Sequence, residues 1–384
     1  MKAAILTTTL SHAAGGPAAS VPPIAHGLAK RGVQTSVLGV TDLDFPEGAK
    51  AWGPKVYAHS PLPPRVLGRA SGMGKTLTEI APDMVDVQGI WNWPSLINLR
   101  HHRATDIPYV VTPRGMLDPW ARAHSAWKKH IVRLWFEDAH LRGATCLRAT
   151  AEMEAEHFRS FGLQNPIAVV PNGVSVEPLP PSIPFNRCMR RMLFVSRVHP
   201  KKGLPLLIRA WAKLAEIYPN WELVVAGPDE LGHTSEMQAL AARLRVPRIQ
   251  WLGPVRGDAK TELYRSADLF ILPTYAENFG LVVAEALANG VPVITSRNAP
   301  WQGLQDNRCG WWITLDQLHL DNAMAEALAL SADERAAMGE RGHAWVERTF
   351  GWDGIVARME DLYTWVAKGG TSPSFVQTCA KQSR

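Results

Sequence analysis

The chain has 384 residues, of which 46% are hydrophobic, with a formal net charge of +6 and a pI near 9.2. These values predict two globular domains of roughly 150–200 residues, and the positive charge favours acidic partners. The four cysteines stand far apart without a C-x-x-C pair, which argues against a zinc site and against a disulfide framework.

The amino-terminal segment 1–16 has one lysine and an apolar run interrupted by threonines. It is too short for a signal peptide, and no later segment approaches about 18 consecutive apolar residues. We therefore expect a cytoplasmic protein.

The first half of the chain alternates predicted strands and helices. The apolar run 2–8 is a predicted strand, and a glycine loop at Gly15 and Gly16 follows it. The proline-rich segment 20–23 predicts the start of a helix that ends at Gly32, before the next strand.

The second half repeats this order. A strand at 192–198, a loop, a helix at 204–219 and a strand at 221–227 follow a proline-rich linker at 176–187. Alternation of this kind predicts parallel sheets with ligand sites at the carboxyl ends of the strands. We expect an α/β protein with domains at 1–178 and 187–351.

Two glutamates surround a predicted helix start in the segment YAENFGLVVAEALANG at 275–290. Glu277 precedes the helix, Asn278 is a suitable N-cap, and Glu285 lies one turn inside. A helix start beside the carboxyl end of a strand binds phosphate through its unpaired backbone N–H groups. Here those groups belong to Phe279, Gly280 and Leu281.

Two cations follow the first strand of the second half. Arg197 and Lys202 together could neutralise a diphosphate, although each one alone would more often be an ordinary surface charge. The carboxylates would then accept hydrogen bonds from hydroxyls, Glu285 from a ribose and Glu277 from a second sugar. Glu277 could instead complement the helix dipole. The favoured ligand is a sugar nucleotide.

These motifs resemble the family 4 retaining glycosyltransferases. The pattern at 277–285 resembles their E-x-F-G-x-x-x-x-E signature, and Pro171-Asn172-Gly173-Val174 resembles a motif that ends their first domain, although Ser175 follows it here. The resemblance implies the GT-B fold, with two Rossmann-like domains whose parallel sheets face each other across a cleft. It also implies that the last helix, 352–368, crosses back to the first domain before a tail at 369–384.

The resemblance further implies metal-independent sugar transfer with retention, no cofactor, and a nucleoside-diphosphate sugar as substrate. Glu277 would be catalytic, and donor binding would involve Gly15, Gly16, Arg197, Lys202, Asn278, Phe279, Gly280, Leu281 and Glu285. Many members have a histidine where this chain has Pro113-Arg114-Gly115-Met116. This motif resembles a subset linked to bacterial surface-polysaccharide assembly and implies Arg114 as an active-site cation. A UDP-hexose is the favoured donor, and a lipid-linked saccharide the favoured acceptor.

The segment 118–138 is a predicted amphipathic helix. We expect Trp120, Trp127, Ile131 and Leu134 to pack on the first sheet and the opposite face, Arg122, Lys129 and Arg133, to point outward. Such a basic face favours binding to the anionic inner surface of a membrane, and a solvated face that binds nothing is the competing interpretation. Trp91, Trp93 and Trp301 lie in predicted loops, where they could stack on an acceptor sugar.

Other functions have weaker support. The segment 68–76 resembles a P-loop with incorrect glycine spacing, and Asp42 and Asp44 imitate a metal-binding D-x-D motif within a predicted loop. A hydrolysing UDP-sugar epimerase of the same fold is the enzymatic alternative. A basic binding protein is the non-enzymatic one, but no pattern typical of nucleic-acid binding is present.

Overall fold

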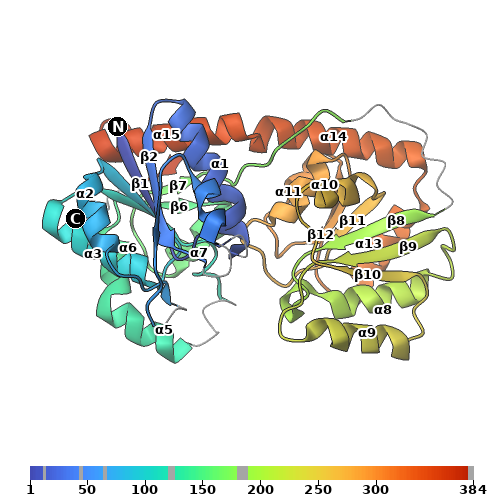
Figure 1. Ribbon diagram of the computed structural model, residues 1–384. Coiled ribbons are helices and arrows are strands. Elements are labelled where there is room, and N and C mark those ends of the chain that lie inside the picture. The colour runs from blue at the N-terminus through green and yellow to red at the C-terminus, as the bar shows by residue number, and fades with distance from the viewer. Residues whose placement is uncertain (12–13, 43–45, 64–66, 120–125, 180–188, 379–384) are drawn as a thin grey trace. The chain divides into compact units, whose positions relative to one another are not determined.

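The structure is a computed structural model that describes residues 1–11, 14–42, 46–63, 67–119, 126–179 and 189–378. The chain divides into two compact units. The first unit contains Met1–Gly173 together with Trp352–Arg384, and the second contains Val174–Gly351. Figure 1 shows each unit as a central sheet covered by helices.

The division lies a few residues before the predicted linker. Val174 belongs to the second unit because its N–H donates to the carbonyl of Phe350 at 2.9 Å. Local proline content could not reveal this contact, because it joins residues far apart in the sequence. Residues 180–188 of the linker lie outside the described residues.

The first unit is built on an eight-stranded sheet with the order β14-β7-β6-β5-β4-β1-β2-β3, parallel except for β14. Its strands are β1 (Lys2–Thr7), β2 (Gln34–Val40), β3 (Val56–His59), β4 (Met84–Gln88), β5 (Tyr109–Thr112), β6 (Cys146–Ala149), β7 (Ile167–Val169) and β14 (Val376–Gln377). The segment 369–384, expected to be only a polar tail, thus contributes an edge strand.

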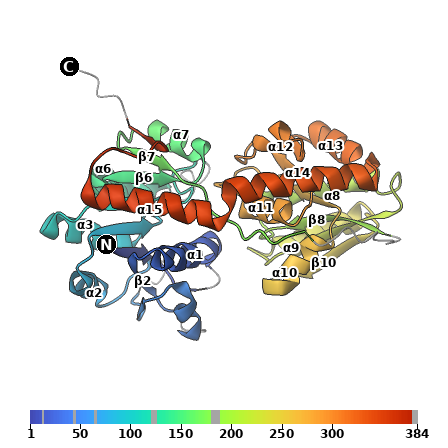
Figure 2. The same cartoon turned by 90° about the horizontal axis from the view of Figure 1, so that it is seen from above.

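The helices of the first unit cover both faces of this sheet. The helices are α1 (Gly16–Lys30), α2 (Met73–Ile80), α3 (Trp93–Thr105), α5 (Ala126–Val132), α6 (Asp138–Gly143), α7 (Glu152–Ser160) and α15 (Trp352–Lys368), with a 3₁₀ helix η2 (Pro46–Trp52) and a π-helix η4 (Arg133–Glu137). α1 and α15 pack on one face, while α2, α3, α6 and α7 pack on the other. Figure 2 shows the last helix, α15, beside α1.

Helix α1 begins earlier than its prolines predicted. Gly15 is its N-cap at φ 63°, and Pro22 and Pro23 lie inside the helix. Glycine adopts positive φ at no steric cost, so the turn at Gly15 rather than the prolines sets the helix start.

The second unit has a six-stranded parallel sheet with the order β10-β9-β8-β11-β12-β13. Its strands are β8 (Arg190–Val195), β9 (Trp221–Ala226), β10 (Ile249–Gly253), β11 (Leu269–Leu272), β12 (Val293–Ser296) and β13 (Gly310–Ile313). Its helices are η5 (Pro200–Lys202), α8 (Leu204–Leu214), α9 (His233–Arg243), α10 (Gly257–Arg265), α11 (Leu281–Ala288), α12 (Gly303–Asp306), α13 (Gln317–Ala329) and α14 (Ala332–Phe350). These two Rossmann-like α/β units confirm the predicted fold class.

Strand order reverses once in each sheet. β1 lies between β2 and β4, and β8 lies between β9 and β11. In open parallel sheets, ligands bind at such a switch point, outside the carboxyl ends of the strands. The loops after β8 and β11 therefore meet at the edge where the second unit should bind its ligand.

A close backbone approach holds these two loops together. Gly203, at φ 72°, lies after β8, and a Cβ there would stand 1.8 Å from the carbonyl oxygen of Pro273, which follows β11. The Tyr275 N–H also donates to the Lys201 carbonyl at 2.8 Å.

We expect Gly203→Ala to destabilise the second unit by roughly 3 kcal/mol, because the new methyl group meets backbone that cannot rotate away. Gly232→Ala is the matched control, since Gly232 has φ 75° but open space at its Cβ position; it should cost about 1–2 kcal/mol from the backbone conformation alone. Denaturant unfolding measures both changes. Equal losses would mean that the approach to Pro273 is unimportant.

Candidate active site

The switch point of the second unit joins a predicted cation to a predicted carboxylate. The Lys202 ammonium contacts the Glu277 carboxylate across the loops after β8 and β11. Both side chains are largely buried, with exposed fractions of 9% and 12%. An ion pair this shielded from water keeps much of its electrostatic strength, so these groups form the electrostatic centre of the site.

Helix α11 begins at this pair. Its N-cap is Gly280 at φ 77°, not Asn278, and Leu281 is its first residue. The positive φ favoured glycine over the polar cap that the sequence suggested. The first N–H groups of an α-helix have no partner within the helix, so the start of α11 offers donors and a positive dipole end beside Glu277.

Phe279 anchors the loop that leads to α11. Its ring is 5% exposed and packs against Trp301 and Phe350, with ring centroids 5.3 and 5.6 Å away. The indole N–H of Trp301 donates to the Phe279 carbonyl at 2.5 Å. Trp301 lies in a loop, as predicted, but the aromatic cluster leaves it only 1% exposed, so it is a core residue and the expectation that it could stack on an acceptor sugar is wrong.

Glu285 has partners that its own helix did not reveal. Lys260 Nζ lies 2.8 Å from its Oε1, and the Tyr264 hydroxyl donates to its Oε2 at 2.8 Å. Both partners lie on α10, so the sequence around Glu285 on α11 could not reveal them. A carboxylate has about four acceptor positions, so Glu285 can still accept hydrogen bonds from a ligand.

Further positive charge lies on the loop after β8. Arg197 is exposed and pairs with Glu230 at 2.8 Å. Burial lowers the pKa of His199, the Glu230 charge opposes this, and the Arg197, His233 and Lys202 charges lower the pKa further. His199 was missed in the sequence, although its place in the HPKKG loop was the available signal.

The predicted residues of the first unit lie at its own switch point. Gly15 and Gly16 follow β1 and begin α1, while Arg114 follows β5 at φ 56°. Arg114 Nε donates to Gln88 Oε1 at 2.8 Å, its Nη2 contacts the same oxygen, and its Nη1 donates to Ser20 Oγ at 2.9 Å. Burial lowers the pKa of Arg114 to about 10.

Arg114 keeps capacity for a ligand. Of the five N–H donors of a guanidinium, these described neighbours use three, which leaves two. The sequence had not identified Gln88 and Ser20, because they are brought to Arg114 only by β4 and α1.

Trp91 lies in the loop after β4, as predicted, whereas Trp93 is the first residue of α3, and both are half-buried. Trp91 has φ 63° and its backbone N–H donates to Glu137 Oε2 at 2.7 Å. The Arg69 guanidinium lies 5.3 Å from the Trp93 ring centroid. Stacking on an acceptor sugar stays a prediction for these two side chains.

The predicted orientation of the 118–138 helix is wrong. Ile131 and Leu134 are 55% and 71% exposed instead of packed on the sheet, and Trp135 is 64% exposed. Arg133 bonds to Asp138 at 2.9 Å and covers the Phe161 ring instead of pointing outward. The π-helix η4 explains the difference, because its wider turns break the spacing from which the faces were derived. Trp120, Arg122 and the Trp127 side chain lie outside the described residues.

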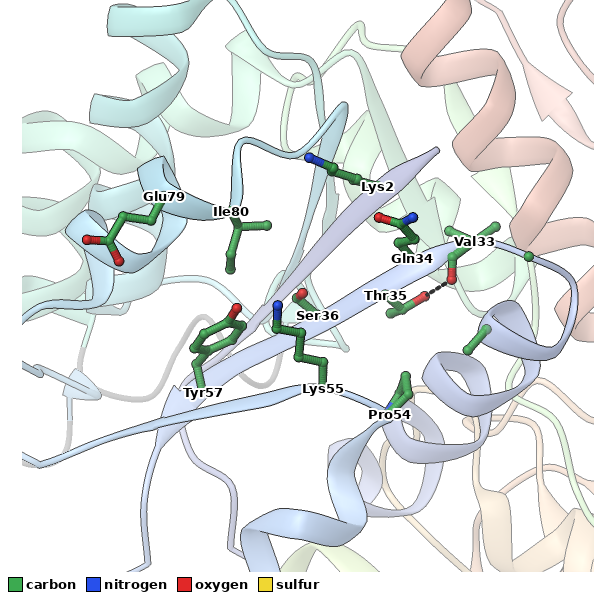
Figure 3. Close-up of a pocket in the computed structure, with 12 residues that line it drawn as sticks. Lys2, Val33, Gln34, Thr35, Ser36, Pro54, Lys55, Tyr57, Glu79 and Ile80 are labelled. Carbon is green, nitrogen blue, oxygen red and sulfur yellow. Dashed lines mark hydrogen bonds between the residues drawn. The ribbon is translucent and has the colours of Figure 1, made fainter.

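The described part of the first unit also has a cavity of about 650 Å³ that none of the predicted site residues lines. Figure 3 shows it beside the amino ends of β1 and β2, with Lys2, Gln34, Tyr57 and Ile80 among its lining residues. The predicted site residues follow the carboxyl ends of their strands instead.

Asp42 of the competing D-x-D motif and Lys75 of the P-loop-like segment each contact another side chain of the protein. Asp42 accepts a hydrogen bond from Ser11 Oγ at 2.5 Å, and Asp44 lies outside the described residues. Lys75 of the P-loop-like segment is exposed and pairs with Glu79 at 3.7 Å. Within the described residues, no group of three or more His, Cys, Asp or Glu side chains could hold a metal ion.

Two family profiles match consecutive parts of the chain. The family described as "Glycosyl transferase 4-like domain" matches residues 15–173, and "Glycosyl transferases group 1" matches residues 179–345. The chain belongs to the family 4 glycosyltransferases of GT-B fold. The two matches together contain every residue that the sequence had assigned to the site.

Curated relatives of this family member cover part of its length. A D-inositol 3-phosphate glycosyltransferase of Catenulispora acidiphila is 30% identical over 65% of this chain. The matched part spans 63% of that relative's own length. The phosphatidyl-myo-inositol mannosyltransferase of Mycobacterium tuberculosis is 28% identical over 56% of the chain and 58% of its own length.

Solved structures of similar fold cover nearly the whole family member. Sucrose-phosphate synthase from Thermosynechococcus elongatus has a TM-score of 0.77 at 20% identity, covering 96% of this chain and all of that one. The Anabaena protein HepE, crystallised with UDP and glucose, has a TM-score of 0.75 at 19% identity, covering 95% and 99%. At these identities the likeness shows the GT-B fold.

We expect Lys202→Met to destabilise the protein by roughly 3 kcal/mol, because it leaves the Glu277 carboxylate buried without its cation. Adding Glu277→Gln should recover most of that loss. Arg197→Met is the matched control: its pair with Glu230 is exposed, with side-chain exposed fractions of 57% and 36%, so the cost should stay below about 1 kcal/mol. Thermal unfolding of the wild type, the two single variants and the double variant measures these changes. Equal losses of stability in Lys202→Met and Arg197→Met would contradict the expectation.

Proposed function

We propose that this protein is a retaining, metal-independent glycosyltransferase that transfers a hexose from a nucleoside-diphosphate sugar, with UDP favoured, to a saccharide acceptor. The observation that carries the proposal is the Lys202–Glu277 pair at the start of α11. A cation, a carboxylate and the first backbone N–H groups of a helix meet there at the place where parallel sheets bind nucleotides. Family membership and the binding of UDP by HepE support the choice of donor.

The donor would replace the carboxylates that now pair with the cations of the site. Its diphosphate takes the Lys202 and Arg197 cations and the first N–H groups of α11, which stabilise charge on the leaving diphosphate without a divalent ion. Glu277, released from Lys202, accepts hydrogen bonds from the transferred sugar. Glu285, held in place by Lys260 and Tyr264, accepts them from the ribose hydroxyls.

The acceptor would be a lipid-linked saccharide in the assembly of a bacterial surface polysaccharide. Arg114, with two donors that its neighbours among the described residues leave unused, supplies an active-site cation in the first unit. Two similar proteins support this acceptor class. One is named phosphatidyl-myo-inositol mannosyltransferase, and WaaG, with a TM-score of 0.70, is described as involved in lipopolysaccharide biosynthesis.

A thermal-shift panel of uridine, guanosine and adenosine diphosphate sugars, recorded in a chelator, tests the donor site. One donor should raise the melting temperature even without divalent ions. Glu285→Ala should weaken its binding about 5- to 150-fold, since the ribose diol loses its acceptor. Glu277→Gln should mainly lower turnover.

Glu340→Ala, on an exposed position of α14, is the control and should change neither property. Wild-type donor affinity and turnover in both site variants would contradict the proposal. A nucleoside diphosphate released equally fast with and without any acceptor would favour the hydrolysing epimerase.

An exposed apolar cluster suggests how the protein reaches a lipid-linked acceptor. Ile131, Leu134 and Trp135 expose 55–71% of their surface, beside Lys129 and His130. In the part of the chain that the structure describes, no helix combines the length and apolar character of a membrane span. We propose peripheral docking at the anionic inner face of a membrane, where apolar side chains enter the interface and nearby cations attract the lipid.

Co-sedimentation with anionic and neutral vesicles at low and high salt tests this docking. The double variant Leu134→Ser with Trp135→Ser should bind at least about tenfold more weakly, because each large apolar side chain contributes roughly 1.5–3 kcal/mol on burial. Ile217→Ser with Leu231→Ser is the control, since these side chains of the second unit are 66% and 84% exposed. Equal binding by both double variants would rule out this cluster as the docking surface.

A further inference from the structure

A buried carboxylate lies beneath Arg114 on the face of the sheet that α1 and α15 cover. Asp86 of β4 is fully buried. The hydroxyl of Tyr363, from α15, donates to its Oδ2 at 2.5 Å, and Thr112 Oγ1 donates to its Oδ1 at 3.3 Å. The last long helix of the chain thereby contacts a charged group of a central strand.

Asp86 is coupled to Arg114 through one short strand. Asp86 and Gln88 stand two positions apart on β4, so their side chains share a face. Gln88 Oε1 accepts from Arg114, and Thr112, which donates to Asp86, lies two positions before Arg114. Asp86 therefore adjoins both the strand residue that binds the guanidinium and the strand end from which Arg114 follows.

The electrostatics of the cluster also depend on Asp86. Arg148 is fully buried and donates to the carbonyls of Val170 and Pro171 at 3.1 and 3.0 Å. Its charge lowers the pKa of Arg114 beyond the effect of burial, while Asp86 and Glu154 raise it. Asp86 thus helps to offset the repulsion between the buried Arg148 guanidinium and the half-buried Arg114 guanidinium.

The Tyr363 hydrogen bond favours the charged form of Asp86, which is the form that offsets the repulsion between Arg148 and Arg114. Burial raises the pKa of Asp86, and the Tyr363 hydrogen bond opposes that shift more than the charge of either Arg148 or Arg114 does. A hydrogen bond to a carboxylate stabilises its charged form and fixes its orientation. The Tyr363 ring itself packs in the apolar cluster of α15, so the ring and the hydroxyl have separable roles.

We propose that Tyr363 and Asp86 are positioning residues that hold the Arg114 guanidinium in the orientation used for sugar transfer, so that α15 contributes to turnover as well as to stability. This inference rests on the proposed role of Arg114. It assigns no contact with substrate to either residue.

The test measures release of nucleoside diphosphate from the donor that the thermal-shift panel identifies. Tyr363→Phe keeps the ring and removes the hydroxyl, and it should lower kcat about tenfold or more while the KM for the donor changes less than about twofold. Thr112→Val, which removes the second donor to Asp86, should lower kcat in the same sense. Tyr109→Phe is the matched control, because Tyr109 is equally buried and its hydroxyl donates at 2.6 Å to the His140 carbonyl; its kcat should stay near wild type.

A double-mutant cycle separates positioning from general destabilisation. Arg114→Lys should lower kcat, and adding Tyr363→Phe to it should cause much less than the tenfold loss seen in the native background, since the group being positioned is already altered. Full additivity, or a Tyr363→Phe kcat equal to wild type while Arg114→Lys is impaired, would overturn the positioning role alone. Unchanged kcat in Arg114→Lys would overturn both this role and the assignment of Arg114.

Discussion

The convergence of parallel strands at one sheet edge is the constraint on which both sites depend. In the second unit, β8 and β11 are neighbours although their paired residues Leu193 and Phe270 stand 77 positions apart in the sequence, and their loops meet where Gly203 approaches Pro273. Only this approach lets Lys202 reach Glu277. In the first unit the same rule brings Gly15, which follows β1, and Arg114, which follows β5, to one edge. The chemistry of each unit is therefore a consequence of its strand order.

Charge balance is the second common feature. Lys202, Arg197 and Lys260 each pair with a carboxylate, namely Glu277, Glu230 and Glu285. Burying an unpaired charge is costly, so such pairing lets a partly buried site keep its cations before any ligand binds. For the proposed donor, the diphosphate replaces Glu277 as the partner of Lys202, and Glu277 then becomes an acceptor for sugar hydroxyls, while Glu285 stays paired with Lys260. One set of residues thus serves both the empty and the occupied site.

Helix α15, near the end of the chain, packs against elements from the first part of the chain. It packs with α1 over the central strands and places Tyr363 against Asp86, 277 positions away in sequence. Since Asp86 and Gln88 lie on one face of β4, the helix that completes the core also adjoins the support of Arg114. Stability and site geometry are consequently coupled in the first unit, because the same buried side chains contribute to both.

The sequence by itself determined the α/β class, the strand–loop–helix–strand order at the start of each half, and the family motifs from Gly15 to Glu285, because periodicity, glycine and proline act over a few residues. It placed the site residues at the correct strand ends for the same reason. It misjudged the starts of α1 and α11, the exposure of Leu134, the burial of Trp301 and the partners of Glu285. Those outcomes depend on backbone turns with positive φ, on a π-helix, and on side chains that arrive from distant elements. Only the tertiary structure decides them, because contact energies between remote residues outweigh local preference wherever chains pack closely.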